Sequence, residues 1–180
     1  MKKILYSIIL VSLVSACKTR QIIDPVNDPT VQVSMNLLAV DNDRILVTVD
    51  PGRFSTSTTT FYIPKTVPGT YSLDNYGKFI EDLTAYDYNG NEINVTQTGD
   101  NSWNFQNATE LDKITYYVND SFDVEGEEGI FSPAGTNILE GENFMLNLHG
   151  FVGYFDNMEE LPYDLSITRP ADLVAGTSMP

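Results

Sequence analysis

Histidine and cysteine, which most often serve in catalysis and in zinc binding, are almost absent from this sequence. The chain of 180 residues has one histidine, His149, and one cysteine, Cys17. A zinc site that needs two histidines cannot be built from it, and the pattern H-E-x-x-H is absent. No serine has a nucleophile-elbow context, and no glycine pattern for a nucleotide occurs. We therefore expect no catalytic residue, no metal site and no cofactor in this chain, and interpret His149 as a surface residue or a packed strand residue.

Carboxylates are abundant, and they concentrate in segments that resemble loops. Asp123, Glu125, Glu127 and Glu128 could bind calcium, which prefers clustered oxygen ligands, but their spacing matches no EF-hand loop. We interpret the segment as a solvated loop. The formal net charge is −15 at pH 7, and a surface this acidic repels phosphate backbones. We therefore expect no nucleic-acid partner.

Cys17 has the sequence context of a lipid attachment site. Two lysines precede an apolar run over residues 4–16, which is shorter than the roughly 20 residues of a transmembrane helix. The run ends in Val-Ser-Ala-Cys, which resembles the bacterial lipobox, where a cysteine thiol is lipidated and becomes the mature N-terminus. We predict a lipoprotein signal peptide over residues 1–16 and a lipid on Cys17. A free thiol and an ordinary cleaved signal peptide are the alternatives.

The segment that follows, residues 17–30, is polar and contains two prolines, Pro25 and Pro29, as expected of a tether between lipid and domain. We expect the protein in the bacterial cell envelope, anchored to a membrane through Cys17 and facing either the periplasm or the exterior.

Beyond the tether, apolar and polar residues alternate with the period of β-strands. Asn89-Gly90 predicts a hairpin, and only residues 75–83 could form a helical turn or two. We predict an all-β domain over residues 31–170, an antiparallel β-sandwich of about nine or ten strands with a short helical turn. Residues 144–148 and 151–155 could be two strands or one strand bent at Gly150. The expected strands cover residues 31–40, 44–50, 58–63, 83–88, 92–97, 102–106, 113–118, 144–148, 151–155 and 163–168.

The connection over residues 63–83 is stiff and aromatic. Pro64 and Pro68 each remove an amide donor, so strand pairing must stop between them, and Gly69 allows a sharp turn that presents Tyr71. Aromatic side chains could form a binding platform, although packing in the core is the commoner fate of such residues. The candidates are Tyr71, Tyr76, Tyr86, Tyr88 and Trp103.

This connection opens an ordered set of short motifs. They are YIP at 62–64, VPGTY at 67–71, LDNY at 73–76, YDYNG at 86–90, SWNF at 102–105 and ITYYV at 114–118. In this order, the chain resembles the N-terminal domain of glycyl aminopeptidase-type metallopeptidases (peptidase family sixty-one), over residues 31–170. Val67 stands where that family usually has tryptophan, and Asp74 where arginine is common, so the resemblance assigns neither side chain a role.

The resemblance implies a non-catalytic β-domain that flanks the peptide-binding cleft of a zinc-dependent catalytic domain absent from this chain. The expected partners are that downstream catalytic domain and the N-terminus of a peptide substrate, with Tyr71, Tyr76 and Trp103 as the expected contacts. Residues 171–180 would begin the missing downstream region. The alternatives are a stand-alone lipid-anchored β-sandwich that binds a glycan, a peptide or a protein partner, and a purely structural role.

Overall fold

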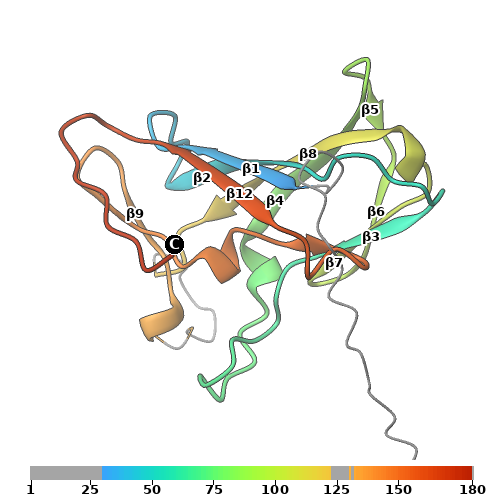
Figure 1. The fold of residues 1–180 in the computed structure, drawn as a ribbon. Helices are drawn as coiled ribbons and strands as arrows, with labels where there is room; N and C mark the ends of the chain where they lie inside the picture. The colour runs from blue at the N-terminus through green and yellow to red at the C-terminus, as the bar shows by residue number, and fades with distance from the viewer. Residues whose placement is uncertain (1–29, 123–129, 131, 180) are drawn as a thin grey trace, which may run out of the picture.

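A computed structural model describes residues 30–122, 130 and 132–179. Within them the chain is almost entirely strands and turns, so the predicted all-β fold is confirmed (Figure 1). The strands are β1 (Val31–Asn36), β2 (Arg44–Asp50), β3 (Thr59–Tyr62), β4 (Ile80–Asp87), β5 (Glu92–Ile93), β6 (Val95–Gly99), β7 (Ser102–Phe105), β8 (Leu111–Asn119), β9 (Asn137–Leu139), β10 (Asn143–Met145), β11 (Tyr154–Phe155) and β12 (Tyr163–Thr168). The 3-10 turns are η1 (Tyr76–Phe79), η2 (Ala108–Glu110), η3 (Ser132–Ala134) and η4 (Leu148–Gly150).

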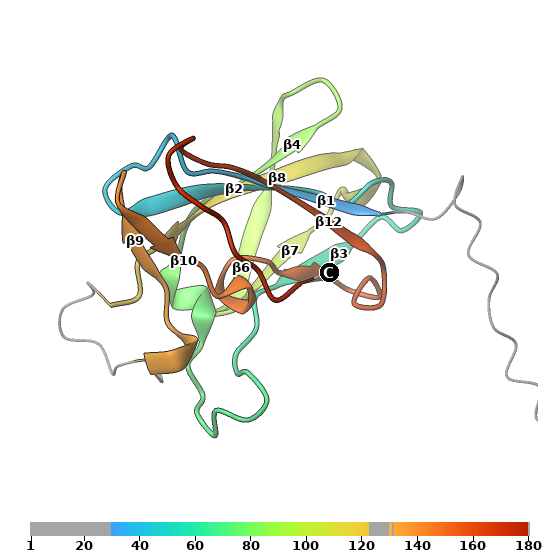
Figure 2. The ribbon, with the colours of Figure 1, turned by 60° about the vertical axis from the view of Figure 1, so that its left-hand side comes forward.

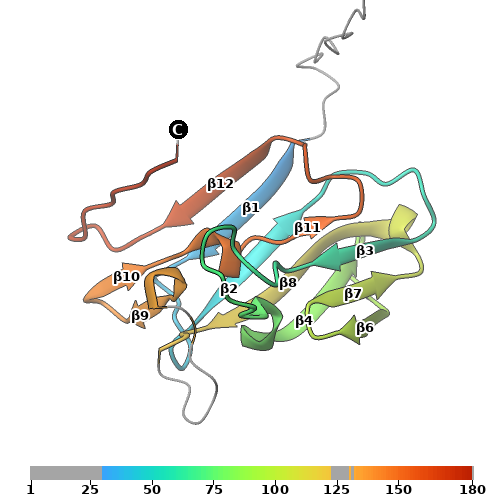
Figure 3. The ribbon, with the colours of Figure 1, turned by 90° about the horizontal axis from the view of Figure 1, so that it is seen from below.

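The described strands form a large sheet, a small sheet and a separate hairpin. The large sheet has the order β12-β1-β2-β8-β4-β5, the small sheet has the order β11-β3-β7-β6, and β9 pairs with β10. Figure 3 shows the small sheet over one end of the large sheet and the β9–β10 hairpin over the other. Among the described strands, β1 and β12 form the only parallel pair, so the sandwich is antiparallel apart from this pair.

The core lies between the two sheets and follows from the alternation of side chains along each strand. β1 buries every second residue from Val31, and β2 buries every second residue from Ile45. From the small sheet, Phe61 contributes a ring whose centroid lies 5.0 Å from that of Phe155 and 5.6 Å from that of Tyr116 on β8. The contact with Phe155 lies within the small sheet, whereas the contact with Tyr116 joins the two layers. Such tilted pairs add to the stabilisation that comes from burying apolar area.

The structure corrects the expected strand over residues 31–40. β1 ends at Asn36, because the Asn36 side chain accepts a hydrogen bond from the Leu38 amide at 3.0 Å and its carbonyl accepts one from the Ala39 amide at 3.3 Å. These local bonds replace strand pairing and form a turn. Leu38 is exposed as a consequence.

The expected strand over residues 92–97 is also corrected, since it divides at Asn94 into β5 and β6. β5 pairs with β4 in the large sheet, whereas β6 pairs with β7 in the small sheet. The chain therefore crosses from one layer to the other at this point. The hairpin predicted at Asn89-Gly90 is confirmed, with Gly90 at φ +81° and its amide 2.9 Å from the Asp87 carbonyl.

In the C-terminal half, the sequence did not predict β9. The two apolar segments predicted on either side of Gly150 correspond to two short strands, β10 and β11, which are separated by η4. β10 begins one residue before the expected range and ends at Met145. Gly150 lies within the 3-10 turn, so the alternative of one strand bent at this glycine is wrong.

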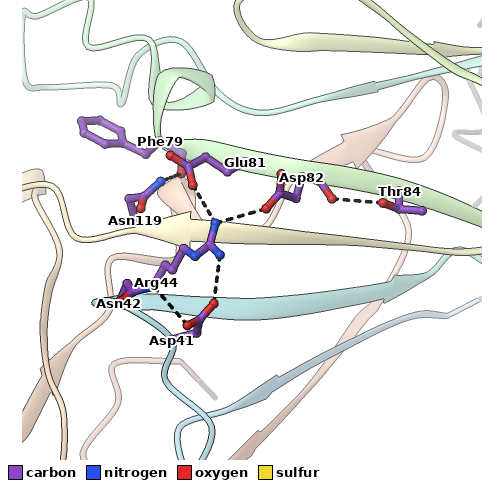
Figure 4. Close-up of polar contacts among 8 residues, drawn as sticks. All are labelled: Asp41, Asn42, Arg44, Phe79, Glu81, Asp82, Thr84 and Asn119. Carbon is purple, nitrogen blue, oxygen red and sulfur yellow. Dashed lines mark hydrogen bonds and ion pairs between the residues drawn. The ribbon is translucent and has the colours of Figure 1, made fainter.

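Arg44 fastens the start of β4 to the middle of the large sheet (Figure 4). Its guanidinium lies 2.7 Å from Glu81, 3.1 Å from Asp82 and 2.9 Å from Asp41, and 4.2 Å from the centroid of the Tyr117 ring. The hydrogen bond with Asp41, followed by those with the other carboxylates, raises the pKa of Arg44 above its ordinary value. β4 bulges here, between Glu81 and Thr84, and the ion pairs hold the irregular segment in register.

Candidate functional site

The most distinctive surface feature is the connection from β3 to η1, residues 63–75, here called the β3–η1 loop. Figures 1 and 2 show it projecting away from the large sheet. The amide of Asn75 donates to the carbonyl of Lys65 at 2.9 Å, and the amide of Tyr76 donates to the carbonyl of Pro64 at 3.3 Å. These bonds close the base of the loop, as in a compact Ω-loop.

Asn101, just before β7, locks the base from the other side. Its buried side-chain oxygen accepts a hydrogen bond from the Gly77 amide at 2.7 Å, and its side-chain nitrogen donates to the Asn75 side chain at 3.2 Å. A Cβ atom on Gly77 would lie 2.1 Å from the backbone oxygen of Asp100. Only glycine at position 77 permits this close approach of two backbone segments.

Asp74 ties the loop to η1 from within. Its buried carboxylate accepts a hydrogen bond from the Ser72 hydroxyl at 2.6 Å and another from the Tyr76 hydroxyl at 3.1 Å. Burial, followed by the bond to Asp74, raises the pKa of Tyr76 above its ordinary value, so this hydroxyl remains a donor at neutral pH. Asp74 therefore stabilises the loop through these hydrogen bonds, at the position where arginine is common in the family that the sequence resembles.

The tip of the loop presents apolar side chains to solvent on a well-bonded backbone. The Thr66 hydroxyl donates to the Ser72 carbonyl at 2.6 Å, and Thr70 donates to the Val67 carbonyl from its amide at 3.2 Å and from its hydroxyl at 2.8 Å. Between these bonds Tyr71 is fully exposed at φ +56°, and Leu73 is mostly exposed. A non-glycine residue in the left-handed region is strained, and such strain is found where structure serves a function.

Tyr71, Tyr76 and Trp103 have different environments. Tyr71 is in solvent, whereas Tyr76 is 2% exposed and Trp103 is 5% exposed. The Tyr76 ring packs edge-on against His149 with centroids 4.7 Å apart, and Trp103 lies 6.3 Å from Phe61. Tyr76 thus supports the base of the loop, whereas Trp103 packs against Phe61 in the core.

Tyr86 and Tyr88, the remaining residues of the hypothetical platform, lie on the β4–β5 hairpin. Figures 1 and 2 show this hairpin on the opposite side of the molecule from the β3–η1 loop. The Lys113 ammonium lies 6.0 Å from the centroid of the Tyr86 ring. The Arg53 guanidinium lies 4.3 Å from the centroid of the Tyr88 ring. The structure does not bring these aromatic side chains together on one surface.

His149 is a packed residue in η4 and not in a strand. Its Nε2 atom lies 3.0 Å from the Ala134 carbonyl, and its ring contacts Tyr76, so it joins η3 and η4 to the base of the β3–η1 loop. Within the described ranges no group of three or more histidine, cysteine, aspartate or glutamate residues could hold a metal ion. The described residues therefore do not fit a zinc site.

Several predictions from the sequence fall outside the described residues. Cys17, the signal peptide and nearly all of the tether precede residue 30, and the acidic segment 123–129 is not described. In the part of the chain that is described, no helix is long and apolar enough to span a membrane. Sequence reasoning also missed Asn101 as the residue that locks the base of the loop, because its partner Gly77 is 24 positions away and becomes a neighbour only on folding. It assigned no role to Leu73 or Asp74, although the partners of Asp74, Ser72 and Tyr76, are close in sequence.

Comparison with known proteins identifies the domain. The profile of the family described as Peptidase M61 N-terminal domain matches residues 30–180. The chain belongs to this family. The resemblance inferred from the ordered motifs is thereby confirmed. No curated protein matches the chain.

A solved structure supports the fold of this M61 N-terminal domain. An aminopeptidase N family protein from Idiomarina loihiensis superposes with a TM-score of 0.65 and 17% sequence identity, over 79% of this chain. The match covers 22% of that protein's chain, so this chain spans less than a quarter of the length of the neighbour.

Proposed function

We propose that this chain is the non-catalytic N-terminal β-domain of a lipid-anchored, zinc-dependent aminopeptidase-like protein, in which it flanks the peptide-binding cleft of a downstream catalytic domain. The family match supports a peptidase parent. The observation that supports the contact with the cleft is the β3–η1 loop, which exposes Tyr71 and Leu73 on a backbone locked at its base. Zinc belongs to the catalytic domain in this proposal, since the described residues provide no ligand set.

The loop is suited to make such a contact because its shape exists before binding. An aromatic and an aliphatic side chain held on a preorganised turn lose little conformational entropy when they are buried by a partner. Tyr71 and Leu73 would contact the wall of the cleft or the N-terminus of a bound peptide. Tyr76 would act as a positioning residue, because it is buried and its hydroxyl donates to Asp74 of the loop, whereas Trp103 is buried against Phe61 and would not touch the peptide.

The membrane part of the proposal concerns Cys17. A lipid on this thiol and a polar tether would hold the domain at the surface of the bacterial envelope, where its acidic character favours solubility. Expression of the chain with its native leader, followed by detergent partitioning and mass spectrometry, tests this directly. The wild type should carry the mass of a lipid, and Cys17→Ser should not. An unmodified Cys17 in the wild type would contradict the anchor.

The second candidate function is a stand-alone binding module, and the same exposed tip is the observation that favours it. In that case Tyr71 and Leu73 would bind a glycan, a peptide or a protein without any catalytic domain. The reading frame beyond Pro180 discriminates between the two functions. A downstream H-E-x-x-H supports the peptidase parent, whereas a stop codon, or several hundred residues without that pattern, rejects it.

In the longer polypeptide, the tip is tested with Tyr71→Ala and Leu73→Ala, and with Tyr88→Ala as a control on the opposite side. Because the tip is exposed, both tip variants should unfold at the wild-type temperature. We expect them to raise the KM for peptides with a free N-terminus by about tenfold, as for loss of an interface contact. Unchanged kinetics in both tip variants would exclude the cleft contact.

A further inference from the structure

A second surface of the domain lies beside β12, at the edge of the large sheet. Figures 2 and 3 show the segment 169–179 turning back after β12 and running alongside that strand. Between this segment, β12 and β10 lies a groove of about 620 Å³. Phe144 on β10 and Leu165 and Ile167 on β12 line it, and so do Val174 and Met179 of the returning segment.

Several large apolar side chains of the groove lining reach solvent. Val174 is 97% exposed, and Ile167 and Met179 are also exposed. Exposed large apolar side chains that gather around one groove mark a contact surface, because each costs hydration free energy when left in water. The tip of the β3–η1 loop contributes no residue to this groove, so the two surfaces are separate.

The rim of the groove has its own charge pattern. Glu142 and Asp164 belong to the lining, and neither forms an ion pair with another described residue. Arg169, the cation at this edge, donates to the backbone carbonyls of Pro170 and Leu173 and so holds the turn after β12. A complementary partner would therefore present an apolar centre with lysine or arginine at its edge.

We propose that this groove is the docking site for the downstream domain of the same polypeptide, and this inference rests on the proposed function. In the longer polypeptide, the chain leaves the β-domain from the wall of the groove itself. A domain joined there by a short connection has an effective concentration in the millimolar range, so even a modest apolar interface is occupied. Docking would bury Val174, Ile167 and Met179 and would cover the edge of the large sheet at β12.

The test uses the longer polypeptide with Val174→Glu, which leaves the β-domain's own core intact because Val174 is in solvent. Hydrogen exchange and calorimetry are measured for the wild type and for the variant. We expect exchange in residues 143–148 and 163–169 to rise by about tenfold or more in the variant, and its single unfolding transition to split into two. Tyr88→Glu, on the opposite side, should change neither.

The outcomes separate the inference from the proposed function. If a zinc peptidase domain follows and Val174→Glu leaves exchange and unfolding as in the wild type, the docking site is wrong and the proposed function stands. A stop codon after Pro180 overturns both. If sedimentation shows a dimer that Val174→Glu dissociates, the groove binds a second copy and the inference is again wrong.

Discussion

Gly77 lies where the start of η1 passes the backbone of residues 100–101. The Cα hydrogen of Gly77 that a side chain would replace faces the carbonyl oxygen of Asp100. We predict that Gly77→Ala lowers the free energy of unfolding by about 1–3 kcal/mol, as other overpacked sites do. The reason is the 2.1 Å approach that a Cβ would make to the Asp100 oxygen, which is backbone and cannot rotate away. Urea unfolding monitored by tryptophan fluorescence measures the loss.

Gly176→Ala is the matched control, because nothing lies within 4 Å of a Cβ at that position. Its free energy of unfolding should stay at the wild-type value within a few tenths of a kcal/mol. Equal stability of the two variants would mean that the base of the β3–η1 loop is not packed as described.

At the scale of elements, the β4–β5 hairpin depends on the exposed carboxylate of Asp87. Its oxygens accept hydrogen bonds from the amides of Asn89 and Asn91, both at 2.8 Å, and from the Asn91 side chain at 3.0 Å. The bond from the Asn91 side chain, followed by the backbone bond from Asn91, holds the pKa of Asp87 below its ordinary value of 3.8. Because the pKa is lowered on folding, this stabilisation is present above pH 3.8 and is lost as the pH falls through the folded pKa.

We predict that Asn91→Ala raises the pKa of Asp87 towards its ordinary value, since it removes the largest cause of the shift. Titration of the Asp87 carboxyl by NMR measures this, and the exchange of the Asn89 amide reports the order of the turn. A pKa of Asp87 that is the same in the variant and the wild type would show that the side-chain bond does not form.

The elements also show which strands a single sequence can predict. β2 and β12 have the bounds that alternation indicated, and each lies in one sheet along its whole length. The strand over residues 92–97 was not predicted as two, because its division at Asn94 depends on pairing with β4 on one side and β7 on the other. Alternation of apolar and polar residues indicates that a segment is extended, but it does not indicate which sheet the segment joins.

At the scale of the whole molecule, buried tyrosines set the alkaline limit of stability. Burial raises the pKa of Tyr116 and Tyr76 well above the ordinary value of 10.0, and burial with the nearby Glu159 raises that of Tyr163 to about 12. A pKa raised on folding means that the protonated form is favoured in the folded state. The stabilisation is therefore complete below pH 10.0 and is lost as the pH rises towards the folded values.

We predict that the free energy of unfolding falls between about pH 10 and about pH 12, and that Tyr163→Phe makes the fall shallower because one titrating group is removed. Urea unfolding at several pH values measures the slope. A stability that rises over this interval, or a slope that Tyr163→Phe leaves unchanged, would contradict the described burial of these hydroxyls.

The whole chain should also be inactive as a peptidase by itself. We predict that the purified chain, incubated with zinc, does not hydrolyse glycyl or alanyl substrates, because its described residues hold no set of metal ligands. Assays with fluorogenic amino-acid amides test this, with an active aminopeptidase as the positive control. Hydrolysis that disappears on chelation would refute the non-catalytic role.

The sequence by itself determined the strand-rich character of the chain and, through the order of short motifs, its kinship with M61 N-terminal domains. Both are local properties, since they depend on residue type and spacing over a few positions. Only the tertiary structure decided that Tyr71 is exposed while Tyr76 and Trp103 are buried. The physical reason is that burial is set by contacts with residues distant in sequence, such as His149 against Tyr76 and Phe61 against Trp103, which alternation does not encode.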